Sequence, residues 1–342
     1  MPTRTLRLEA PDAAACQPAI GRAAALLREG GLVAFPTETV YGLGANALDA
    51  RAVRRIFEAK QRPAWDPLIV HVTSRHMLDR VADRLPDGFE ALAARFMPGP
   101  LTILVERSRA VPDEVTAGRP IVAVRMPAHP VARALIEAAG IPVAAPSANR
   151  FGHASPTTAA HVLADLDGRI DAVLDAGPTM VGIESTVLDI TVSPPQILRA
   201  GGLTREALTS AIGPVEIYRA PVADAPPEAL RAPGTGIRHY APRARLVLVE
   251  TIEELAPVAG RLVAGGRRVG ALWPAIPGSP AAPAGVVAVA WGPWGDWAAR
   301  ARNLFAGLRA LDEEGVDAIV CPLPPEDGLG LAIRDRLQKA AR

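Results

Sequence analysis

The stretch KQRPAWDPLIVH, residues 60–71, places two cations on a loop stiffened by proline. Lys60 and Arg62 stand before the first proline, and Asp66 stands before the second, which opens an apolar run ending at His71. A fixed guanidinium fork suits bidentate binding of phosphate or carboxylate. The cations also follow a predicted helix, where the helix dipole favours positive surface charge. The stretch therefore indicates either an anion clamp or dipole-matched surface charge.

Arg125 stands alone in the apolar segment IVAVRMP. Strand alternation puts Arg125 on one face with Ile121 and Ala123. An unpaired buried charge is costly, so this side chain must reach a sheet edge or meet a partner. The partner could be a protein carboxylate or the carboxylate of a substrate.

The segment FPTETVYGLGANA combines hydroxyl groups with glycines. Thr37 and Thr39 flank Glu38, and Gly42 and Gly44 follow. Hydroxyls and exposed amides on a glycine-containing turn suit the binding of an anion or an amino acid. A tight turn with a capping threonine is the structural alternative.

Further polar side chains lie at the ends of other predicted strands. Ser147, Asn149 and Ser155 in AAPSANRFGHASP follow one strand, Ser185 in GIESTVLDI opens another, and Arg199 in QILRAGG closes a third. Ligands of α/β proteins gather at the carboxyl ends of strands, although a local turn would account for any one hydroxyl.

His239 and Tyr240 in GTGIRHYAP lie instead on the predicted linker. Aromatic and basic side chains in a linker indicate that it docks on another surface.

No sequence feature supports covalent catalysis. Neither cysteine lies near a histidine in the sequence, and there is no GxSxG or HExxH motif. The candidate groups are arginine, lysine, serine, threonine and asparagine, with few carboxylates. This set suits electrostatic and positioning catalysis of nucleotidyl or phosphoryl transfer.

The elements expected to position these residues alternate between strands and helices, which predicts an α/β fold with a mixed sheet. On the strand alternation, Leu68, Val70 and Val72 share one face, and Ile69 and His71 share the other. Helices are predicted after the capping residue Asp49, at 88–97, at 129–140 and near 157–166; strands are predicted at 32–37, 67–72, 101–106, 121–127, 141–146, 172–176, 185–190 and 196–200.

The chain of 342 residues is too long for one ordinary core. We expect a first domain over 1–212, a linker rich in proline and alanine over 213–243, and a small three-layer α/β domain over 244–342. The net charge of +1 does not indicate a general nucleic-acid-binding protein. Two distant cysteines favour a reducing compartment, and the absence of a signal-like or membrane-spanning apolar run predicts a cytoplasmic location without a membrane partner.

Taken together and in order, these motifs resemble the Sua5/YrdC/YciO family. The resemblance covers most of residues 20–210, and the motif PGTGIRHYAP with the α/β tail is similar to the longer, Sua5-type members. It implies a YrdC-like twisted mixed sheet around a large, concave, positively charged cavity in a catalytic domain, plus a smaller Rossmann-like C-terminal domain.

The implied activity is the synthesis of L-threonylcarbamoyl-AMP from L-threonine, bicarbonate and ATP, with pyrophosphate and water released. This product serves N6-threonylcarbamoyladenosine formation in tRNAs that read ANN codons. The implied cofactor is Mg²⁺ with ATP, without a dedicated protein metal site. The implied partners are a downstream threonylcarbamoyl transferase (TsaD-type) machinery and, weakly, tRNA or double-stranded RNA.

The resemblance also implies roles for individual residues. Lys60 and Arg62 look like the catalytic clamp on the triphosphate. Asp66 stands where the family often has asparagine, and an acid there would repel the triphosphate unless a metal or Arg62 intervenes. The threonine ligands would be Thr39, His71, Arg125, Ser185 and the backbone of Ala145; the ATP ligands would be Arg62, Asp66, Ser147, Ser155, Arg199, Tyr240 as a lid, and the backbone of Ile121; Thr37, Asn149 and His239 are further candidates.

Two other functions compete with this interpretation. One is a tRNA-binding or double-stranded-RNA-binding module without catalysis, against which stand the near-neutral charge and the lack of an aromatic-basic stripe. The other is a hydrolase or a carbamoyltransferase-associated relative that binds adenylates and uses another acyl acceptor. A pyrophosphate assay with different amino acids separates the enzymatic possibilities.

Overall fold

The computed structural model describes residues 4–218, 240–276 and 281–342. The chain divides into two units. The first unit comprises Met1–Phe151, Pro156–Met180 and Glu184–Gly236, and the second comprises Gly152–Ser155, Val181–Ile183 and Ile237–Arg342. Two short segments from the first part of the sequence therefore belong to the second unit.

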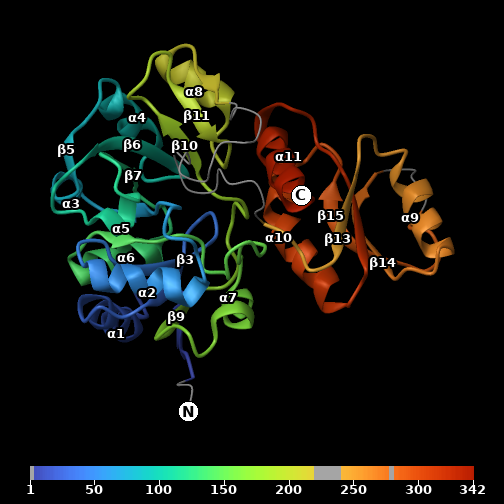
Figure 1. Ribbon diagram of the computed structural model, residues 1–342, viewed down its shortest axis with the longest axis horizontal. Coiled ribbons are helices and arrows are strands. Elements are labelled where there is room, and N and C mark those ends of the chain that lie inside the picture. Colours follow the sequence, from blue (N-terminus) through green and yellow to red (C-terminus); the bar gives the residue numbers. More distant parts are fainter. Residues whose placement is uncertain (1–3, 219–239, 277–280) are drawn as a thin grey trace. The chain divides into compact units, whose positions relative to one another are not determined.

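The strands of the first unit form a twelve-stranded sheet that mixes parallel and antiparallel pairs (Figure 1). Its order is β1-β9-β2-β3-β8-β4-β7-β6-β10-β11-β12, and β5 pairs with β6 off this path. The strands are β1 (Leu6–Glu9), β2 (Val33–Pro36), β3 (Tyr41–Asn46), β4 (Ile69–His71), β5 (Ala82–Arg84), β6 (Leu101–Arg107), β7 (Ile121–Arg125), β8 (Val143–Ala144), β9 (Ala172–Asp175), β10 (Thr186–Asp189), β11 (Gln196–Arg199) and β12 (Glu216–Ile217).

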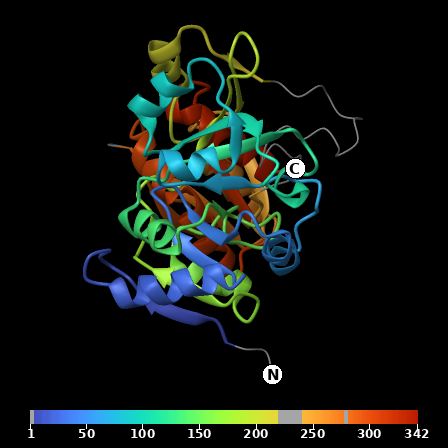
Figure 2. The ribbon, with the colours of Figure 1, turned by 90° about the vertical axis from the view of Figure 1, so that its left-hand side faces the viewer.

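Helices accompany this sheet, and α1 and α6 pack side by side (Figure 2). Asp49 caps α2 by accepting from the amides of Arg51 and Ala52, as predicted. The α6 helix ends at Gly140, whose φ of 68° lies in the left-handed region that glycine tolerates. The helices are α1 (Gln17–Arg28), α2 (Ala50–Lys60), α3 (Arg75–Asp79), α4 (Phe89–Phe96), α5 (Asp113–Thr116), α6 (Pro130–Ala139), α7 (Ala159–Leu166) and α8 (Arg205–Ile212).

The two faces of the central strands bury different side chains. Leu68, Val70 and Val72 belong to the large core with the apolar sides of the helices, as the alternation predicts. Ile69 belongs instead to a small separate cluster with Leu104, Ala123, Val187 and Leu198. The face that carries this small cluster also carries the polar residues described below.

The structure corrects the interpretation of the glycine-containing segment as a turn. Gly42 and Gly44 lie inside β3, which pairs with β2 in a hairpin. A Cβ on Gly44 would lie 2.8 Å from the ring of Phe35 and 2.9 Å from Val143, so this strand needs glycine for close packing rather than for turning. Strand β8 is also shorter than the predicted 141–146, and β12 continues the sheet to Ile217, beyond the boundary predicted at residue 212.

The second unit contains a parallel sheet of order β13-β16-β14-β15. In Figure 1, α9 lies on one side of this sheet and α10 and α11 on the other, which is the predicted three-layer arrangement. Its elements are β13 (Arg245–Val249), α9 (Leu255–Ala264), β14 (Val269–Ala275), β15 (Val286–Pro293), α10 (Trp297–Glu313), β16 (Ala318–Pro322) and α11 (Gly328–Ala340).

None of the helices in the described segments combines the length and apolar character needed to cross a membrane.

Candidate functional site

Strand register gathers polar side chains on the face of the sheet opposite the large core. His71 lies opposite Arg125 in the β4–β7 pair, and Arg125 lies opposite Thr102 in the β7–β6 pair. Ser185 reaches Thr102 with its hydroxyl at 2.8 Å, and Arg199 donates to Ser185. We call His71, Thr102, Arg125, Ser185 and Arg199 the polar face; all five residues are buried.

Arg125 forms a buried ion pair with Glu38. The Nη2 atom of Arg125 lies 2.8 Å from Oε1 of Glu38, and Nε donates to the carbonyl oxygen of Gly99 at 3.3 Å. Of the two partners that the sequence left open, the structure therefore shows a protein carboxylate. Binding of a substrate carboxylate by Arg125 stays a prediction, and it would add to or replace this pair.

His71 is held in its neutral form on the polar face. Burial and then the positive charge of Arg125 lower the pKa of His71 to about 3. The ring meets Phe35 edge to face, with centroids 6.1 Å apart. A neutral imidazole near a cation can offer hydrogen bonds to a ligand without adding positive charge.

Arg199 and Ser185 form the second half of the polar face. Nε of Arg199 donates to the carbonyl oxygen of Ser185 at 3.2 Å, and Nη2 donates to the same oxygen at 2.9 Å and to Oγ at 3.2 Å. The Arg199 fork thus fixes Ser185, the residue that precedes β10. Thr102 could not be singled out from the sequence, because a threonine in an apolar strand carries no signal until its neighbours are known.

The turn of the β2–β3 hairpin is tied together by its own hydroxyls. Oγ1 of Thr37 lies 2.8 Å from Oγ1 of Thr39 and donates to the carbonyl oxygen of Val40 at 2.6 Å. Both threonines are buried. The turn therefore presents Glu38 and the two hydroxyls in a fixed arrangement.

Lys60 joins the end of α2 to the loop after β8. Its Nζ donates at 2.5 Å to the carbonyl oxygens of both Ser147 and Asn149. Burial and then the charge of Arg62 lower the pKa of Lys60 well below its usual range. The structure thus brings Lys60, Ser147 and Asn149 together, with the lysine fixing the backbone of the loop.

Arg62 and Asp66 form a second buried ion pair. Nη2 of Arg62 lies 2.8 Å from Oδ1 of Asp66 and donates to the carbonyl oxygen of Pro67 at 2.9 Å, while Nε donates to the carbonyl oxygen of Asp66 at 3.2 Å. The guanidinium carbon lies 6.0 Å from the ring centroid of Phe151. Arg62 therefore pairs with Asp66, the acidic residue that stands where the family often has asparagine.

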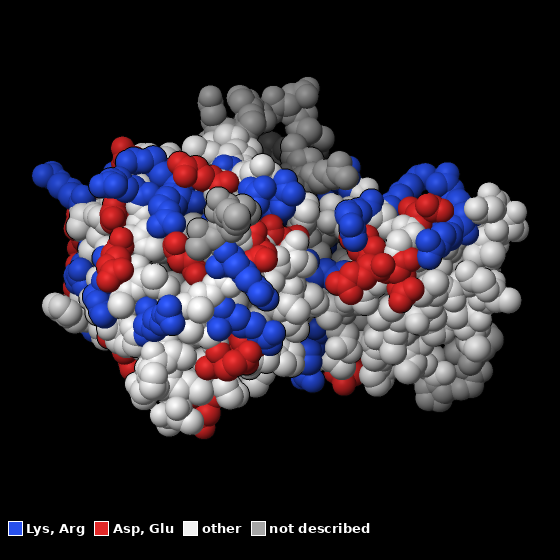
Figure 3. All heavy atoms as spheres, turned by 90° about the horizontal axis from the view of Figure 1, so that it is seen from below, with Lys and Arg blue, Asp and Glu red and all other residues white. Residues whose placement is uncertain are grey.

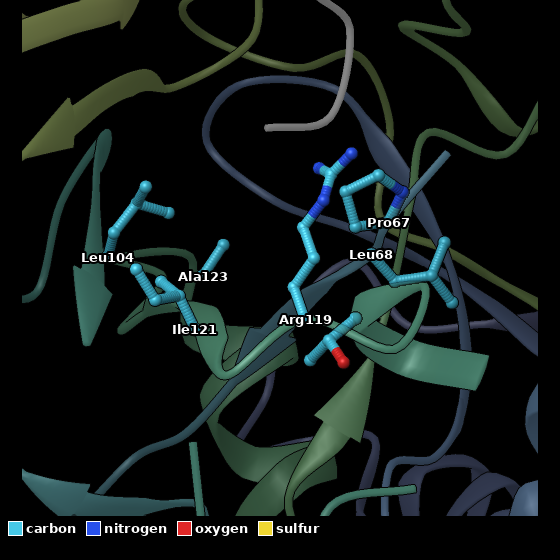
Figure 4. Close-up of a pocket in the computed structure, with 7 residues that line it drawn as sticks. Pro67, Leu68, Leu104, Arg119, Ile121 and Ala123 are labelled. Atoms are coloured by element: carbon cyan, nitrogen blue, oxygen red, sulfur yellow. The ribbon is translucent and has the colours of Figure 1, made fainter. Parts of the chain in front are cut away.

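A small recess, partly open to solvent, lies beside Pro67, the residue that follows Asp66. Figure 4 shows the Arg119 side chain between Ile121, Ala123 and Leu104 on one side and Pro67 and Leu68 on the other. Burial lowers the pKa of Arg119, and the charge of Asp66 opposes that shift. Ile121, predicted to contact a nucleotide through its backbone, lines this recess. Arg119 and Thr116 line it too, and the sequence did not single out either residue.

The other predicted residues divide between the units. Ala145 donates its amide to the carbonyl oxygen of Ile69 at 2.9 Å in the first unit. Ser155 and Tyr240 belong to the second unit, and His239 lies outside the described residues. Tyr240 is buried there, stacked on Phe305 with centroids 5.6 Å apart.

The described residues offer no cluster of side chains that could bind a metal ion. Over residues 4–218, 240–276 and 281–342, no group of three or more His, Cys, Asp or Glu side chains could hold a metal ion. On the face drawn in Figure 3, basic and acidic side chains are interspersed.

The sheet with a buried polar face and the following parallel-sheet unit define a two-part α/β protein. A family model of the Sua5/YciO/YrdC group, described as "Telomere recombination", matches residues 25–201, and one described as "Threonylcarbamoyl-AMP synthase, C-terminal domain" matches residues 203–342. The chain belongs to the Sua5/YciO/YrdC family.

Curated relatives and a solved structure agree with this assignment. The chain is 47% identical to the threonylcarbamoyl-AMP synthase of Pyrococcus abyssi, over 93% of each chain. It is 44% identical to that of Bacillus subtilis, over 95% of this chain and 93% of the relative. The crystal structure of P. abyssi Sua5 complexed with L-threonine matches with a TM-score of 0.90 and 44% identity, covering 99% of this chain and 98% of that one.

Proposed function

We propose that this protein is an enzyme of the nucleotidyltransferase type that makes L-threonylcarbamoyl-AMP from L-threonine, bicarbonate and ATP. The observation that carries the proposal is the full-length match to P. abyssi Sua5, a protein solved with L-threonine. The polar face supplies groups of the right chemistry for an amino acid, because arginine, hydroxyl and neutral imidazole groups bind carboxylates and amines.

The proposed reaction has two steps. The amine of threonine takes up CO₂, delivered as bicarbonate, and gives N-carboxy-threonine with loss of water. A carbamate oxygen then attacks the α-phosphorus of ATP in line, the bond from the α-phosphorus to the bridging oxygen breaks, and pyrophosphate leaves with the electron pair. Because a carbamate is unstable in water, the reaction calls for a site from which water is excluded.

The threonine side of the proposed site is the β2–β3 turn with the polar face, apart from Arg199. Arg125 would bind the carboxylate, and the hydroxyls of Thr39 and Ser185 would bind polar groups of the amino acid. His71, whose pKa is lowered to about 3, would act as a neutral hydrogen-bonding group at physiological pH. The backbone of Ala145 completes this proposed set.

The ATP side of the proposed site is the loop region around Lys60 and Arg62. Both cations contact protein oxygens, so phosphates would have to share or take over these contacts. Arg199 and Ser147 would add further donors, and Asp66 and the backbone of Ile121 would face the nucleotide. These donors would stabilise the charge that develops on the phosphates.

Mg²⁺ would enter this site as part of the substrate MgATP. Magnesium usually keeps several waters and is bound through substrate phosphates and one or two carboxylates. The carboxylate of Asp66 in this region is engaged with Arg62, so the substrate phosphates would hold the ion. The ion would neutralise phosphate charge while the protein orients the reacting groups.

The product is proposed to serve the formation of N6-threonylcarbamoyladenosine in tRNAs that read ANN codons, in the cytoplasm. A mixed anhydride of a carbamate and AMP is reactive, so a downstream transferase of the TsaD type would have to consume it.

The test is pyrophosphate release by the purified full chain with ATP and Mg²⁺. We expect release only when L-threonine and bicarbonate are both present. Release that is indifferent to either substrate would refute the proposed activity, and equal rates with serine or valine would refute the choice of amino acid.

A further inference from the structure

We propose that Glu38 is a positioning residue that fixes the guanidinium of Arg125 for an α-carboxylate and thereby sets the affinity for the amino acid. The inference rests on the proposed function, in which Arg125 meets the carboxylate of threonine. It concerns a residue that none of the predicted ligand sets includes, and it assigns that residue a role in one half of the site only.

The two carboxylate oxygens of Glu38 have two different partners. Oε1 lies 2.8 Å from Nη2 of Arg125, and Oε2 accepts from the amide of Ala128 at 3.1 Å. Ala128 follows β7 in the chain, so Glu38 holds both the side chain at the end of that strand and the backbone beyond it. The carboxylate therefore fixes where Arg125 points relative to its own strand.

Glu38 is itself held rigidly. It stands between Thr37 and Thr39, whose hydroxyls lie 2.8 Å apart, and Thr37 also donates to the carbonyl oxygen of Val40. The side chain of Glu38 is only 6% exposed. A group with little freedom of its own can restrict its partner without a large entropic cost.

The buried guanidinium of Arg125 needs a negatively charged partner, and its other neighbours are uncharged. The guanidinium is 5% exposed and lies next to a neutral His71 and the uncharged Thr102 on the neighbouring strands. Burial raises the pKa of Glu38, but the charge and hydrogen bond of Arg125 outweigh it, so the pKa is lowered and the carboxylate is ionised. Glu38 thus both neutralises and orients the arginine.

In this arrangement, the affinities for threonine and for ATP depend on different residues. A guanidinium has five N–H donors, and Glu38 and Gly99 contact one edge of it. A substrate carboxylate would approach the remaining donors, whose direction depends on the contacts already made. The nucleotide side depends on Lys60 and Arg62, which have other partners, so a change at Glu38 should affect threonine and leave ATP untouched.

Steady-state kinetics of the full chain test this separation, with pyrophosphate as the readout. For Glu38→Ala we expect the threonine KM to rise about tenfold or more, with the ATP KM within about twofold of the wild type. Glu38→Gln should give a smaller rise, because its single acceptor oxygen can keep either the Arg125 or the Ala128 contact but not both. Calorimetric titration with L-threonine should show the same order of affinities without turnover.

A matched control is Asp171→Asn, which breaks the ion pair of Asp171 with Arg55 elsewhere in the first unit. It should lower the melting temperature and leave both KM values unchanged. A purely structural role of Glu38 would change kcat or the active fraction without separating the two KM values.

The outcomes distinguish the inference from the proposed function. Wild-type protein that needs threonine for turnover, together with a Glu38→Ala variant whose two KM values move equally or not at all, would overturn the inference alone. A lower threonine KM in that variant would also overturn it, since Glu38 would then compete with the substrate for Arg125. Wild-type protein that neither binds threonine nor uses it would overturn both.

Discussion

Arg62 and Arg125 in the first unit and Arg300 in the second are all buried, but their partners differ. In the first unit, Arg62 and Arg125 lie against carboxylates, each with a closest distance of 2.8 Å. In the second unit, Arg300 is completely buried among indole rings, with its guanidinium carbon 4.1 Å from the ring centroid of Trp294. Its Nε donates to the carbonyl oxygen of Pro293 at 2.9 Å.

An arginine paired with a carboxylate and an arginine surrounded by indole rings suit different roles. A guanidinium has five N–H donors, so an arginine oriented by one carboxylate keeps further donors for a substrate carboxylate or phosphate. A cage of indole rings instead stabilises the cation by cation–π attraction and packing. Burial lowers the pKa of Arg300 to about 10, and the charge of Asp296 opposes that shift. We therefore assign binding to the first set and structural support to the second.

The largest effect on activity is expected in the first unit, from the substitution Lys60→Met. The change removes the two hydrogen bonds to the loop carbonyls of Ser147 and Asn149 and one proposed phosphate contact. We expect kcat/KM to fall about 10²–10³-fold, the range for losing one donor to developing charge. Lys60→Arg serves as the control for charge alone. A loss below tenfold in Lys60→Met would mean that the lysine takes no part in the reaction.

The matching experiment in the second unit is Arg300→Ala. It empties the space among Trp291, Trp294 and Trp297 and removes the hydrogen bond to Pro293. We expect a loss of roughly 2–4 kcal/mol in the free energy of unfolding, seen by urea denaturation. Both KM values should stay unchanged below the transition. A selective change in one KM would show that the indole cage is more than structural.

A third experiment concerns pH and the neutral His71. Its pKa is about 3 in the folded protein and 6.5 when unperturbed, so between these values the unfolded state binds the extra proton. Stability should fall as the pH falls from about 6.5 toward 3, by up to about 1.4 kcal/mol per pH unit from this group. His71→Gln should flatten that part of the curve measured by denaturation at each pH. An unchanged slope would contradict a neutral, buried imidazole.

The smallest effect is expected from Asp66→Asn, which tests how Asp66 influences ATP binding. In Asp66→Asn, the remaining oxygen can still accept from Arg62 while the negative charge disappears. We expect the ATP KM to fall by about threefold, because repulsion of the triphosphate is removed and the arginine stays oriented. Titration with ATP checks this result. Weaker ATP binding would mean instead that the charge of Asp66 is needed to hold Arg62.

Local features of the fold were predictable from the sequence. The Asp49 cap, the stop of α6 at Gly140 and the two faces of β4 follow from capping chemistry and strand period, which act over a few residues. The β3 strand was misread as a turn, because its glycines are required by Phe35 and Val143 from neighbouring strands. Nothing in the local sequence reports such a contact.

The candidate site was predictable in its residue types and less so in its pairings. Arg125 in an apolar strand announced the need for a partner, but Glu38 is far away in sequence and is brought to it by the hairpin. The contacts of Lys60 with the loop after β8 and of Arg199 with Ser185 are likewise long-range. Register and loop placement decide these contacts, and both depend on the whole sheet.

The central claim is that carbon from bicarbonate joins threonine and AMP in one product. The most direct measurement is mass spectrometry of the reaction of the full chain with ATP, Mg²⁺, L-threonine and ¹³C-bicarbonate. The account predicts a product that contains threonine, one labelled carbon and AMP, formed in equal amount to pyrophosphate. A product that lacks the label, or pyrophosphate formed without any threonine-containing adenylate, would contradict it.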